Sequence, residues 1–198
     1  MIFAWRHPRP QQANAQDGGL CIGRTDVPVD PRRARRLARR IERSAHEHDL
    51  PRVIWTSPLQ RCADVGRWLR RWGWRHHIDA ALIEMDFGAW DGLPWSAIAH
   101  AEVEAWNENF AHYKPGGGES LTEVLTRVAA WQSGNHSGNQ PANHAANQPG
   151  PVLIVAHAGW MRARRWLDEH NAANAALLTS ATLPTAPSYG ALWKLGVP

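Results

Sequence analysis

The chain has 198 residues, 43% of them hydrophobic, which fits one globular domain over residues 1–198 and excludes an intrinsically disordered protein. Its 22 basic and 18 acidic residues leave a net charge of +4, and all the basic residues except Lys114 and Lys194 are arginines, whose planar donor fork suits phosphate and carboxylate. Two cysteines, Cys21 and Cys62, are too few for a disulfide framework or a zinc site.

The sequence carries no export or membrane signal. The N-terminal stretch MIFAWRHP is too short and too soon charged for a signal peptide. No apolar run approaches the ~20 residues that a membrane helix needs. We therefore expect a cytoplasmic protein with no membrane partner.

Short apolar runs predict the strands of a sheet. Ile2–Trp5, Val53–Thr56 and Val152–Ala156 read as buried strands, and Ala191–Leu195 is a weaker fourth. Helical patterns lie between these runs. The alternation predicts an α/β fold, with a mostly parallel central sheet and helices on both of its faces.

Five helices are predicted between and after these strands. The first runs from Pro31 to Asp49 and buries one stripe of side chains, Ala34, Leu37, Ala38, Ile41 and Ala45. Ser57 and Pro58 look like the N-cap and first position of the second helix. Its apolar face consists of Leu59, Cys62, Ala63, Gly66 and Leu69. The remaining helices are expected at Trp95–Phe110, Leu121–Trp131 and Trp160–His170.

Residues 132–150, QSGNHSGNQPANHAANQPG, interrupt this pattern. They contain no large aliphatic residue, so they bury too little apolar surface to offset the entropy lost on ordering. We predict a flexible surface insertion between a helix and the strand at Val152. Its two histidines are too few and too loosely held to predict a metal site.

Basic side chains follow the predicted strands. The first strand ends in Arg6 and His7, the second is followed by Arg61 in the next helix, and the third ends in His157. Ligands of open α/β sheets bind at the carboxyl ends of the strands, where helix N-termini also favour anions. We therefore expect these four side chains to surround one anion.

A phosphoryl group is the anion that best fits these residue types. A neutral imidazole attacks phosphorus and holds the phosphoryl group covalently, while two arginine forks and a second histidine bind its oxygens. The leaving alkoxide then needs a proton, and the candidate donor is Glu84 in IEMDFGAWDG. Asp86, two residues further on, points to the opposite side if this segment is extended.

Five motifs in order, RHP, SPLQR, EMDFGAWDG, GGGES and AHAGW, resemble those of the histidine phosphatase (phosphoglycerate mutase-like) superfamily over residues 2–165. The resemblance implies a three-layer α/β sandwich with a small helical cap and a chemistry that needs no metal or other cofactor. It matches His7 to the phosphorylated histidine and Glu84 to the proton donor. It matches the phosphate-binding residues to Arg6, Arg61 and His157.

Within this family, RHPRP followed by GLCIGRTDVPV most resembles the α-ribazole phosphatases of cobalamin biosynthesis. The resemblance implies α-ribazole 5′-phosphate as substrate, and its benzimidazole ring would stack on a tryptophan such as Trp90 or Trp95. A phosphoglycerate mutase-like enzyme or a sugar-phosphate phosphatase is the alternative. Most members have Gly where this chain has Pro8, which lacks an N–H but keeps a carbonyl able to hold the tautomer of His7.

Several other residues are weaker candidates. Arg24 and Thr25, in GRTD, are predicted to contact the substrate, with a surface turn as the alternative, and Ala158 is predicted to contact it too. Glu119 and Ser120 either position substrate or begin a helix, where Ser120 would serve as its cap. Cys21 is expected to be a small packed residue and not a reactive one, and Cys62, beside Arg61, is expected to be tolerated by the packing.

Two rival functions are weighed against a phosphatase. The basic segment RRARRLARRIER, residues 32–43, and the pI of 9.7 fit a nucleic-acid binder. The arginines alternate with an apolar stripe, however, as expected for a surface helix, so we expect no nucleic-acid partner. The other rival is an inactive family member that binds a phosphorylated ligand, which only Pro8 favours. A homodimer is left open.

Overall fold

The computed structural model describes residues 1–11, 19–133, 150–170 and 177–196. Its central sheet has five strands in the order β3-β2-β4-β1-β5. These strands are β1 (Ile2–Arg6), β2 (Val53–Thr56), β3 (Arg75–Ile78), β4 (Val152–Ala156) and β5 (Leu192–Leu195). Only β5 is antiparallel to its neighbour, β1, and the other pairs are parallel. The predicted α/β fold with a mostly parallel sheet is confirmed.

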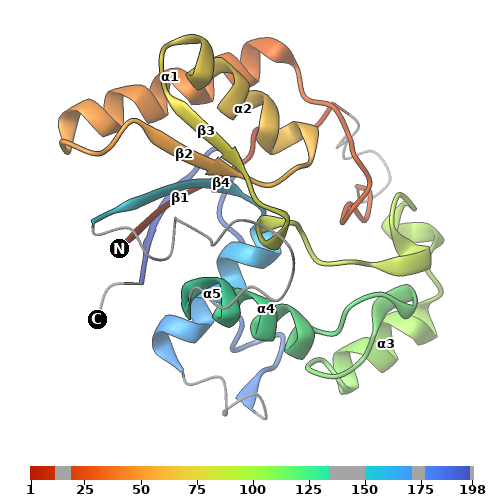
Figure 1. Cartoon of the computed structure of the whole chain (residues 1–198). Helices are drawn as coiled ribbons and strands as arrows, with labels where there is room; N and C mark the ends of the chain where they lie inside the picture. The colour runs from red at the N-terminus through yellow and green to blue at the C-terminus, as the bar shows by residue number, and fades with distance from the viewer. Residues whose placement is uncertain (12–18, 134–149, 171–176, 197–198) are drawn as a thin grey trace.

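Helices cover both faces of the sheet. α1 (Pro31–Glu47) and α2 (Gln60–Arg71) lie on one face, and α4 (Leu121–Ser133) and α5 (Ala158–Glu169) lie on the other (Figure 1). α3 (His100–Glu108) and the short turns before it stand to one side of these layers, near the end of the sheet where α4 begins. The result is a three-layer sandwich with a small helical cap.

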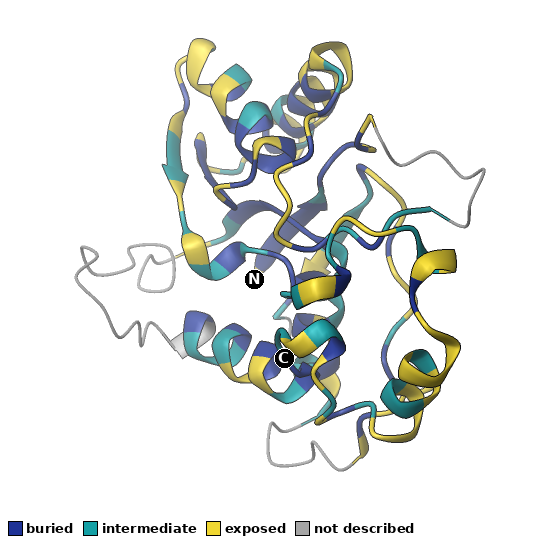
Figure 2. Ribbon diagram, turned by 90° about the vertical axis from the view of Figure 1, so that its right-hand side faces the viewer, coloured by how far each residue is buried: buried dark blue, intermediate teal, exposed yellow. Residues whose placement is uncertain are grey.

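Alternation along the strands explains the two cores. In β1, Phe3 and Trp5 pack with α1 and α2, whereas Ile2 and Ala4 pack with α4 and α5. β4 alternates in the same way, and its residues pair with β1 in register, for example Phe3 with Leu153. Figure 2 shows the strands buried at the centre and the outer sides of the helices exposed.

Two differences from the predicted elements have a local cause. β3 was not predicted because its sequence, RHHI, is polar and lies at an edge of the sheet, where it is only partly buried. The helix predicted at Trp95–Phe110 is wrong as one element, because Ile98 and Ala99 are extended and separate a short 3₁₀ turn, Trp95–Ala97, from α3.

The start of the second helix also differs from the prediction. α2 begins at Gln60 rather than at Pro58, and its N-cap residue, Leu59, has no side chain that can cap it. The missing cap comes from a distant residue, since the Asp26 carboxylate accepts a hydrogen bond of 2.6 Å from the Gln60 N–H. The helix end is thereby tied to the loop that precedes α1.

The predicted insertion at 132–150 lies mostly outside the described residues. α4 continues through Ser133, and residues 134–149 are not described. Within the described ranges no helix is long and apolar enough to cross a membrane.

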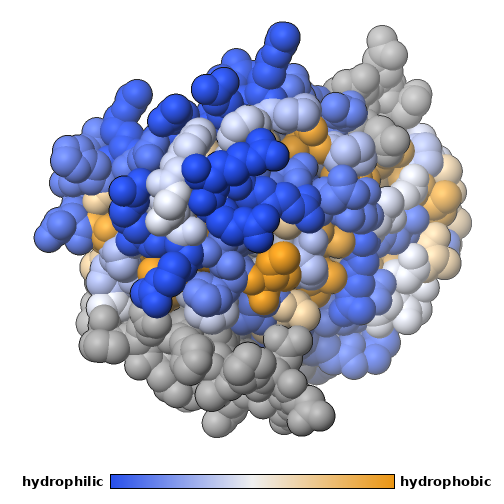
Figure 3. All heavy atoms as spheres, turned by 45° about the horizontal axis from the view of Figure 1, so that its top comes forward, coloured by the Kyte–Doolittle hydropathy of each residue, from blue (hydrophilic) through white to orange (hydrophobic). Residues whose placement is uncertain are grey.

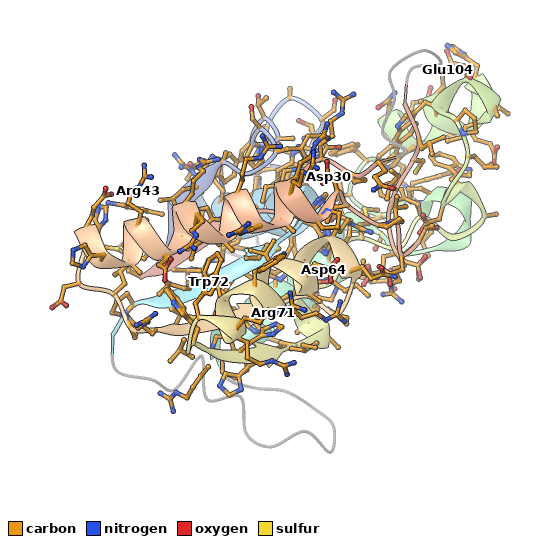
Figure 4. All side chains as sticks on the ribbon, turned by 90° about the horizontal axis from the view of Figure 1, so that it is seen from above. Asp30, Arg43, Asp64, Arg71, Trp72 and Glu104 are labelled. Carbon is orange, nitrogen blue, oxygen red and sulfur yellow. The ribbon has the colours of Figure 1, made fainter. Side chains whose placement is uncertain are left out.

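The outer surface of α1 and α2 is strongly hydrophilic in the space-filling view (Figure 3). Its arginines are held against neighbouring side chains: Arg39 stacks on Trp72 at 4.0 Å and pairs with Glu42 at 2.9 Å, and Arg71 stacks on Trp68. Figure 4 shows Arg71 and Trp72 on this layer, far from Glu104 of α3. The basic helix predicted from RRARRLARRIER is thus an outer helix whose apolar stripe is buried.

Candidate active site

The side chains predicted to surround one anion meet at the carboxyl ends of β1 and β4. His7 continues β1 by donating its backbone N–H to Ala156, 3.0 Å away, and both His7 and His157 are buried. Their ring centroids lie 5.0 Å apart. Arg61, in the first turn of α2, donates from Nε to His157 Nδ1 at 3.2 Å. Segments about fifty and one hundred residues apart therefore converge as the strand order requires.

A backbone carbonyl sets the tautomer of His7. Its Nδ1 lies 2.7 Å from the carbonyl oxygen of Pro8, which only accepts hydrogen bonds, so Nδ1 carries the proton and Nε2 keeps its lone pair. Burial and then the charge of Arg61 hold the pKa of His7 well below its ordinary value. The ring is consequently neutral at physiological pH, and its Nε2 is unprotonated.

Arg61 is held in place before any ligand arrives. Besides His157, it donates to the backbone oxygens of Thr25 at 2.7 Å and Gly23 at 2.5 Å. The Asp91 carboxylate fixes that loop by accepting the backbone N–H groups of residues 23, 24 and 25, at 3.0, 2.5 and 3.1 Å. Thr25 thus meets the site through its carbonyl oxygen.

His157 is also neutral and fully buried. Its Nδ1 accepts from Arg61, which leaves the proton on Nε2, and Nε2 donates to Ser57 Oγ at 2.8 Å. Burial, followed by the charge of Arg61, lowers the pKa of His157 well below its ordinary value. Cys62 Sγ lies 3.4 Å from the same Nε2, and burial raises the pKa of its thiol.

Arg6 is clamped by the segment that precedes β5. Its Nη1 donates to the Pro187 carbonyl at 2.6 Å, and its guanidinium lies 3.9 Å from the ring centroid of Tyr189. The Tyr189 ring is also 5.5 Å from the His7 ring. Arg6 Nε is buried and has no hydrogen-bond partner among the described residues, and the residue lines the cavity.

Glu84 reaches the site from the loop before the cap. Its carboxylate accepts the backbone N–H of Gly159 at 3.1 Å and that of Met85 at 3.0 Å, and the residue is only 8% exposed. A Cβ on residue 159 would lie 2.3 Å from Glu84 Oε1, so glycine at the start of α5 makes room for this carboxylate. Asp86 lies elsewhere, since it pairs with Arg24 at 3.2 Å.

These groups lie at one end of a cavity of about 430 Å³. Arg6, His7, Glu84, Ala158 and Gly159 line that end, whereas Arg61 and His157 are buried beneath it. Most of the remaining wall is apolar, and it consists of Pro10, Gly19, Leu20, Ile22, Met85, Phe87, Trp95, Trp106, Phe110, Leu121 and Leu183. Arg9, Arg162 and Tyr189 complete it.

The family model described as "Histidine phosphatase superfamily (branch 1)" matches residues 2–180 of this chain. The chain belongs to this superfamily. A bifunctional protein of Mycobacterium tuberculosis is 32% identical over 109 residues, which are 53% of this chain and 28% of that protein. A probable fructose-2,6-bisphosphatase of Schizosaccharomyces pombe is 29% identical over 115 residues, 56% of this chain and 24% of the relative. The chain therefore spans about a quarter of the length of these curated relatives.

Solved structures share the fold of this histidine phosphatase superfamily member over most of its length. The mycobacterial glucosyl-3-phosphoglycerate phosphatase in complex with VO3 is 26% identical, covers 90% of this chain and 87% of its own, and has a TM-score of 0.63. A Thermus thermophilus protein, TTHB049, covers 96% of this chain and 90% of its own at 22% identity, with a TM-score of 0.65.

Several substrate-binding predictions fall outside the cavity wall of this superfamily member. Arg24 forms ion pairs with Asp86 and Glu119, and Glu119 also pairs with Arg127 at 2.9 Å. Ser120 caps the start of α4, as the alternative interpretation had it, by accepting the Glu123 N–H at 3.3 Å. Trp95 lines the cavity, whereas Trp90 is buried in the cap and Cys21 packs beside it.

Three residues with evident contacts to the site were not predicted. The sequence around Tyr189 gave no indication of a functional role, because this residue lies between turn residues and far from every motif. Asp91 lies within the EMDFGAWDG motif, yet only the structure reveals its three backbone partners. Arg162 was detectable in principle, since it follows Ala158 by four residues and Gly159 by three in α5, and that spacing brings all three to the same side of the helix.

Proposed function

We propose that the chain is a phosphomonoesterase that transfers a phosphoryl group to His7 and then to water. The observation that carries the proposal is the 2.7 Å hydrogen bond from His7 Nδ1 to the Pro8 carbonyl, which leaves Nε2 unprotonated at the floor of a cavity. This bond supports the proposal for a chain with Pro8, because it uses the carbonyl that proline retains and not the missing N–H.

The first step forms a bond from His7 Nε2 to phosphorus and breaks the bond from phosphorus to the ester oxygen. The leaving oxygen takes the proton of the Glu84 carboxyl group. In the second step water attacks the same phosphorus, its proton passes to Glu84, and the nitrogen–phosphorus bond breaks. Inorganic phosphate leaves, and His7 and Glu84 return to their starting forms.

Arg6 and Arg61 would stabilise the charge on the phosphoryl oxygens during both steps. Arg6 lines the cavity, and only one of the five N–H donors of its guanidinium bonds the Pro187 carbonyl. A guanidinium has five N–H donors, and the hydrogen bonds of Arg61 to Thr25, Gly23 and His157 leave further donors free. His157 would orient Arg61 through their hydrogen bond, and it would lie beside the phosphoryl group bound to His7.

For the substrate we propose α-ribazole 5′-phosphate, on the resemblance of RHPRP and GLCIGRTDVPV to that branch. A sugar or glycerate phosphate is the second candidate, favoured by the structural likeness to a glucosyl-3-phosphoglycerate phosphatase. Both are small phosphate monoesters, so the proposed chemistry is the same for each.

The test is to trap the phosphoenzyme. Wild type, His7→Ala and His76→Gln are mixed with a radiolabelled phosphate ester and quenched in base, where phosphohistidine survives, or in acid, where it does not. His76, on the far edge strand, is the matched control. We expect base-stable, acid-labile label on wild type and His76→Gln but not on His7→Ala, together with release of phosphate. Hydrolysis that persists in His7→Ala would refute the proposal.

A further inference from the structure

The cavity divides into a charged end and an apolar end. Within the part of the chain that the structure describes, its ionisable side chains other than Tyr189 come from the end of β1 and the residues after it, from the segment at Glu84 and from α5, namely Arg6, His7, Arg9, Glu84 and Arg162. Among the described residues, those that the cap contributes to the wall include no charged side chain. The phosphate of a substrate fits the charged end, so the apolar end receives the organic group of the ester.

The cap side of the wall is aromatic. Phe87 packs edge-on against both Trp95 and Trp106, with ring centroids 6.2 Å apart in each pair. The rings of Trp95 and Trp106 are parallel within 4° at 6.4 Å, and Phe110 stacks on Trp106 at 5.5 Å. All four rings line the cavity. The cap side of the wall is therefore a cluster of four aromatic rings, whose only side-chain hydrogen-bonding groups are the indole N–H donors of the two tryptophans.

These rings are fixed in advance by a second layer. Trp90, which does not line the cavity, is buried behind them and packs edge-on against Trp106 at 5.9 Å. The loop that carries Phe87 is locked against the glycine turn before α4, because a Cβ on residue 88 would lie 2.1 Å from the Gly116 carbonyl. Preorganised faces of this kind bind a flat ring without further loss of side-chain entropy.

The same wall is unsuited to a polyhydroxylated group. Each sugar hydroxyl that enters an apolar pocket without a partner loses its hydrogen bonds to water, and the side chains of the four rings offer only the indole N–H groups of Trp95 and Trp106 to replace them. An aromatic group loses no such bonds and gains contact with four rings. The wall therefore disfavours phosphate esters of sugars and favours phosphate esters that carry a flat apolar group.

We propose that the substrate is a phosphate monoester of an alcohol that carries a fused aromatic ring, which the cap wall of Phe87, Trp95, Trp106 and Phe110 binds. This inference rests on the proposed phosphatase function and deepens it by naming the class of the organic group. α-Ribazole 5′-phosphate is one member of the class, and unsubstituted glycerate and hexose phosphates are not.

The test compares esters with the same type of leaving oxygen. 2-(2-Naphthyl)ethyl phosphate, 2-cyclohexylethyl phosphate and glucose 6-phosphate are all esters of primary alcohols, so differences in kcat/KM report binding of the organic group. For wild type we expect kcat/KM to be about tenfold higher for the naphthyl ester than for the cyclohexyl ester, in line with the strength of aromatic pairing. We expect a larger gap to glucose 6-phosphate.

Variants locate the preference. Trp106→Leu keeps an apolar side chain but removes the flat face, and we expect the naphthyl-to-cyclohexyl ratio to fall to about one. The control Trp72→Leu removes a tryptophan from the α1 and α2 layer, far from α3 in Figure 4, and we expect it to leave the ratio unchanged. A wild-type ratio near one, or equal loss of the ratio in both variants, overturns the inference.

Binding separates this inference from the proposed function. Calorimetry with the non-hydrolysable 2-(2-naphthyl)ethylphosphonate and 2-cyclohexylethylphosphonate measures the aromatic preference without turnover. Tighter binding of the naphthyl compound with no hydrolysis of any ester refutes the phosphatase and retains the aromatic wall. Hydrolysis of all esters with equal binding of both phosphonates retains the phosphatase and refutes the wall.

Discussion

Replacing Tyr189 by Leu should reduce catalysis without unfolding the protein. The Tyr189 ring contacts two of the groups proposed for phosphoryl transfer, the Arg6 guanidinium at 3.9 Å and the His7 ring at 5.5 Å. A cation over an aromatic face in a partly desolvated site contributes about 1–2 kcal/mol. Loss of that contribution in the transition state lowers kcat/KM by roughly 5- to 30-fold, since 1.4 kcal/mol corresponds to a factor of ten.

The assay uses p-nitrophenyl phosphate and inhibition by vanadate, which mimics the five-coordinate transition state. If Tyr189 positions Arg6, the inhibition constant of vanadate should rise in Tyr189→Leu by the same factor by which kcat/KM falls. Tyr189→Phe keeps the ring and should retain most of the activity. Because Tyr189 is 38% exposed, we expect the melting temperature of both variants to stay close to that of wild type.

The reasoning would be refuted if Tyr189→Leu kept kcat/KM within about twofold of wild type. It would also fail if Tyr189→Phe lost as much as Tyr189→Leu, because the hydroxyl group and not the ring face would then be responsible. A fall in activity that only accompanies a fall in melting temperature would assign Tyr189 a structural role.

Three further predictions test other parts of the site. Glu84→Gln should slow hydrolysis of an alkyl phosphate at least tenfold more than that of p-nitrophenyl phosphate, whose leaving group needs no proton; equal slowing argues against the acid role. Asp91→Asn leaves backbone N–H groups unsatisfied, so we expect it to lower the free energy of unfolding in urea by about 1–3 kcal/mol and to lower kcat/KM. An unchanged urea midpoint counts against the role given to Asp91. Folding lowers the pKa values of His7, His157 and His76, the last to about 4. Below pH 6.5 the unfolded chain therefore binds more protons than the folded chain. The free energy of unfolding consequently falls as the pH drops from 7 to 5. The slope approaches about 1.4 kcal/mol per pH unit for each histidine, and His76→Gln should reduce the total slope by about one third; an identical slope contradicts the assignment.

Most of the layered fold was predictable from the strands and the first helix. The runs Val53–Thr56 and Val152–Ala156 match β2 and β4, because a strand buried on both faces is apolar along its whole length. β3 was not predicted because an edge strand needs no continuous apolar run, and Arg75–Ile78 is held by its pairing with β2 instead. The second helix start also depends on a distant carboxylate, which no local pattern reveals.

The candidate site was predictable for the residues whose positions are determined by the order of the strands. His7, Arg61 and His157 each follow a parallel strand, and the strand order brings them together. What the sequence does not reveal is how each side chain is held. The tautomer of His7 depends on the distance to one carbonyl, and Arg6 depends on Tyr189, more than one hundred and eighty residues away.

Two of the substrate predictions show the limit of reasoning from local motifs. Arg24 was expected to contact the substrate because it follows the first strand, but its guanidinium is engaged by Asp86 and Glu119. Trp90 was a candidate for stacking, yet it is the residue that supports Trp106 from behind. Whether a side chain points into a cavity or supports its wall is decided by packing between segments, which one sequence does not display.

The pairing of β5 with β1 has a consequence for biosynthesis. Ribosomes release the N-terminus first, so His7 and Arg6 emerge long before the segment that clamps them. Until residues 187–195 have been made, His7 lacks its contact with the Tyr189 ring, and β1 lacks its pairing with β5. A nascent chain is therefore expected to be inert toward phosphate esters, and activity begins only when the last strand closes over the first.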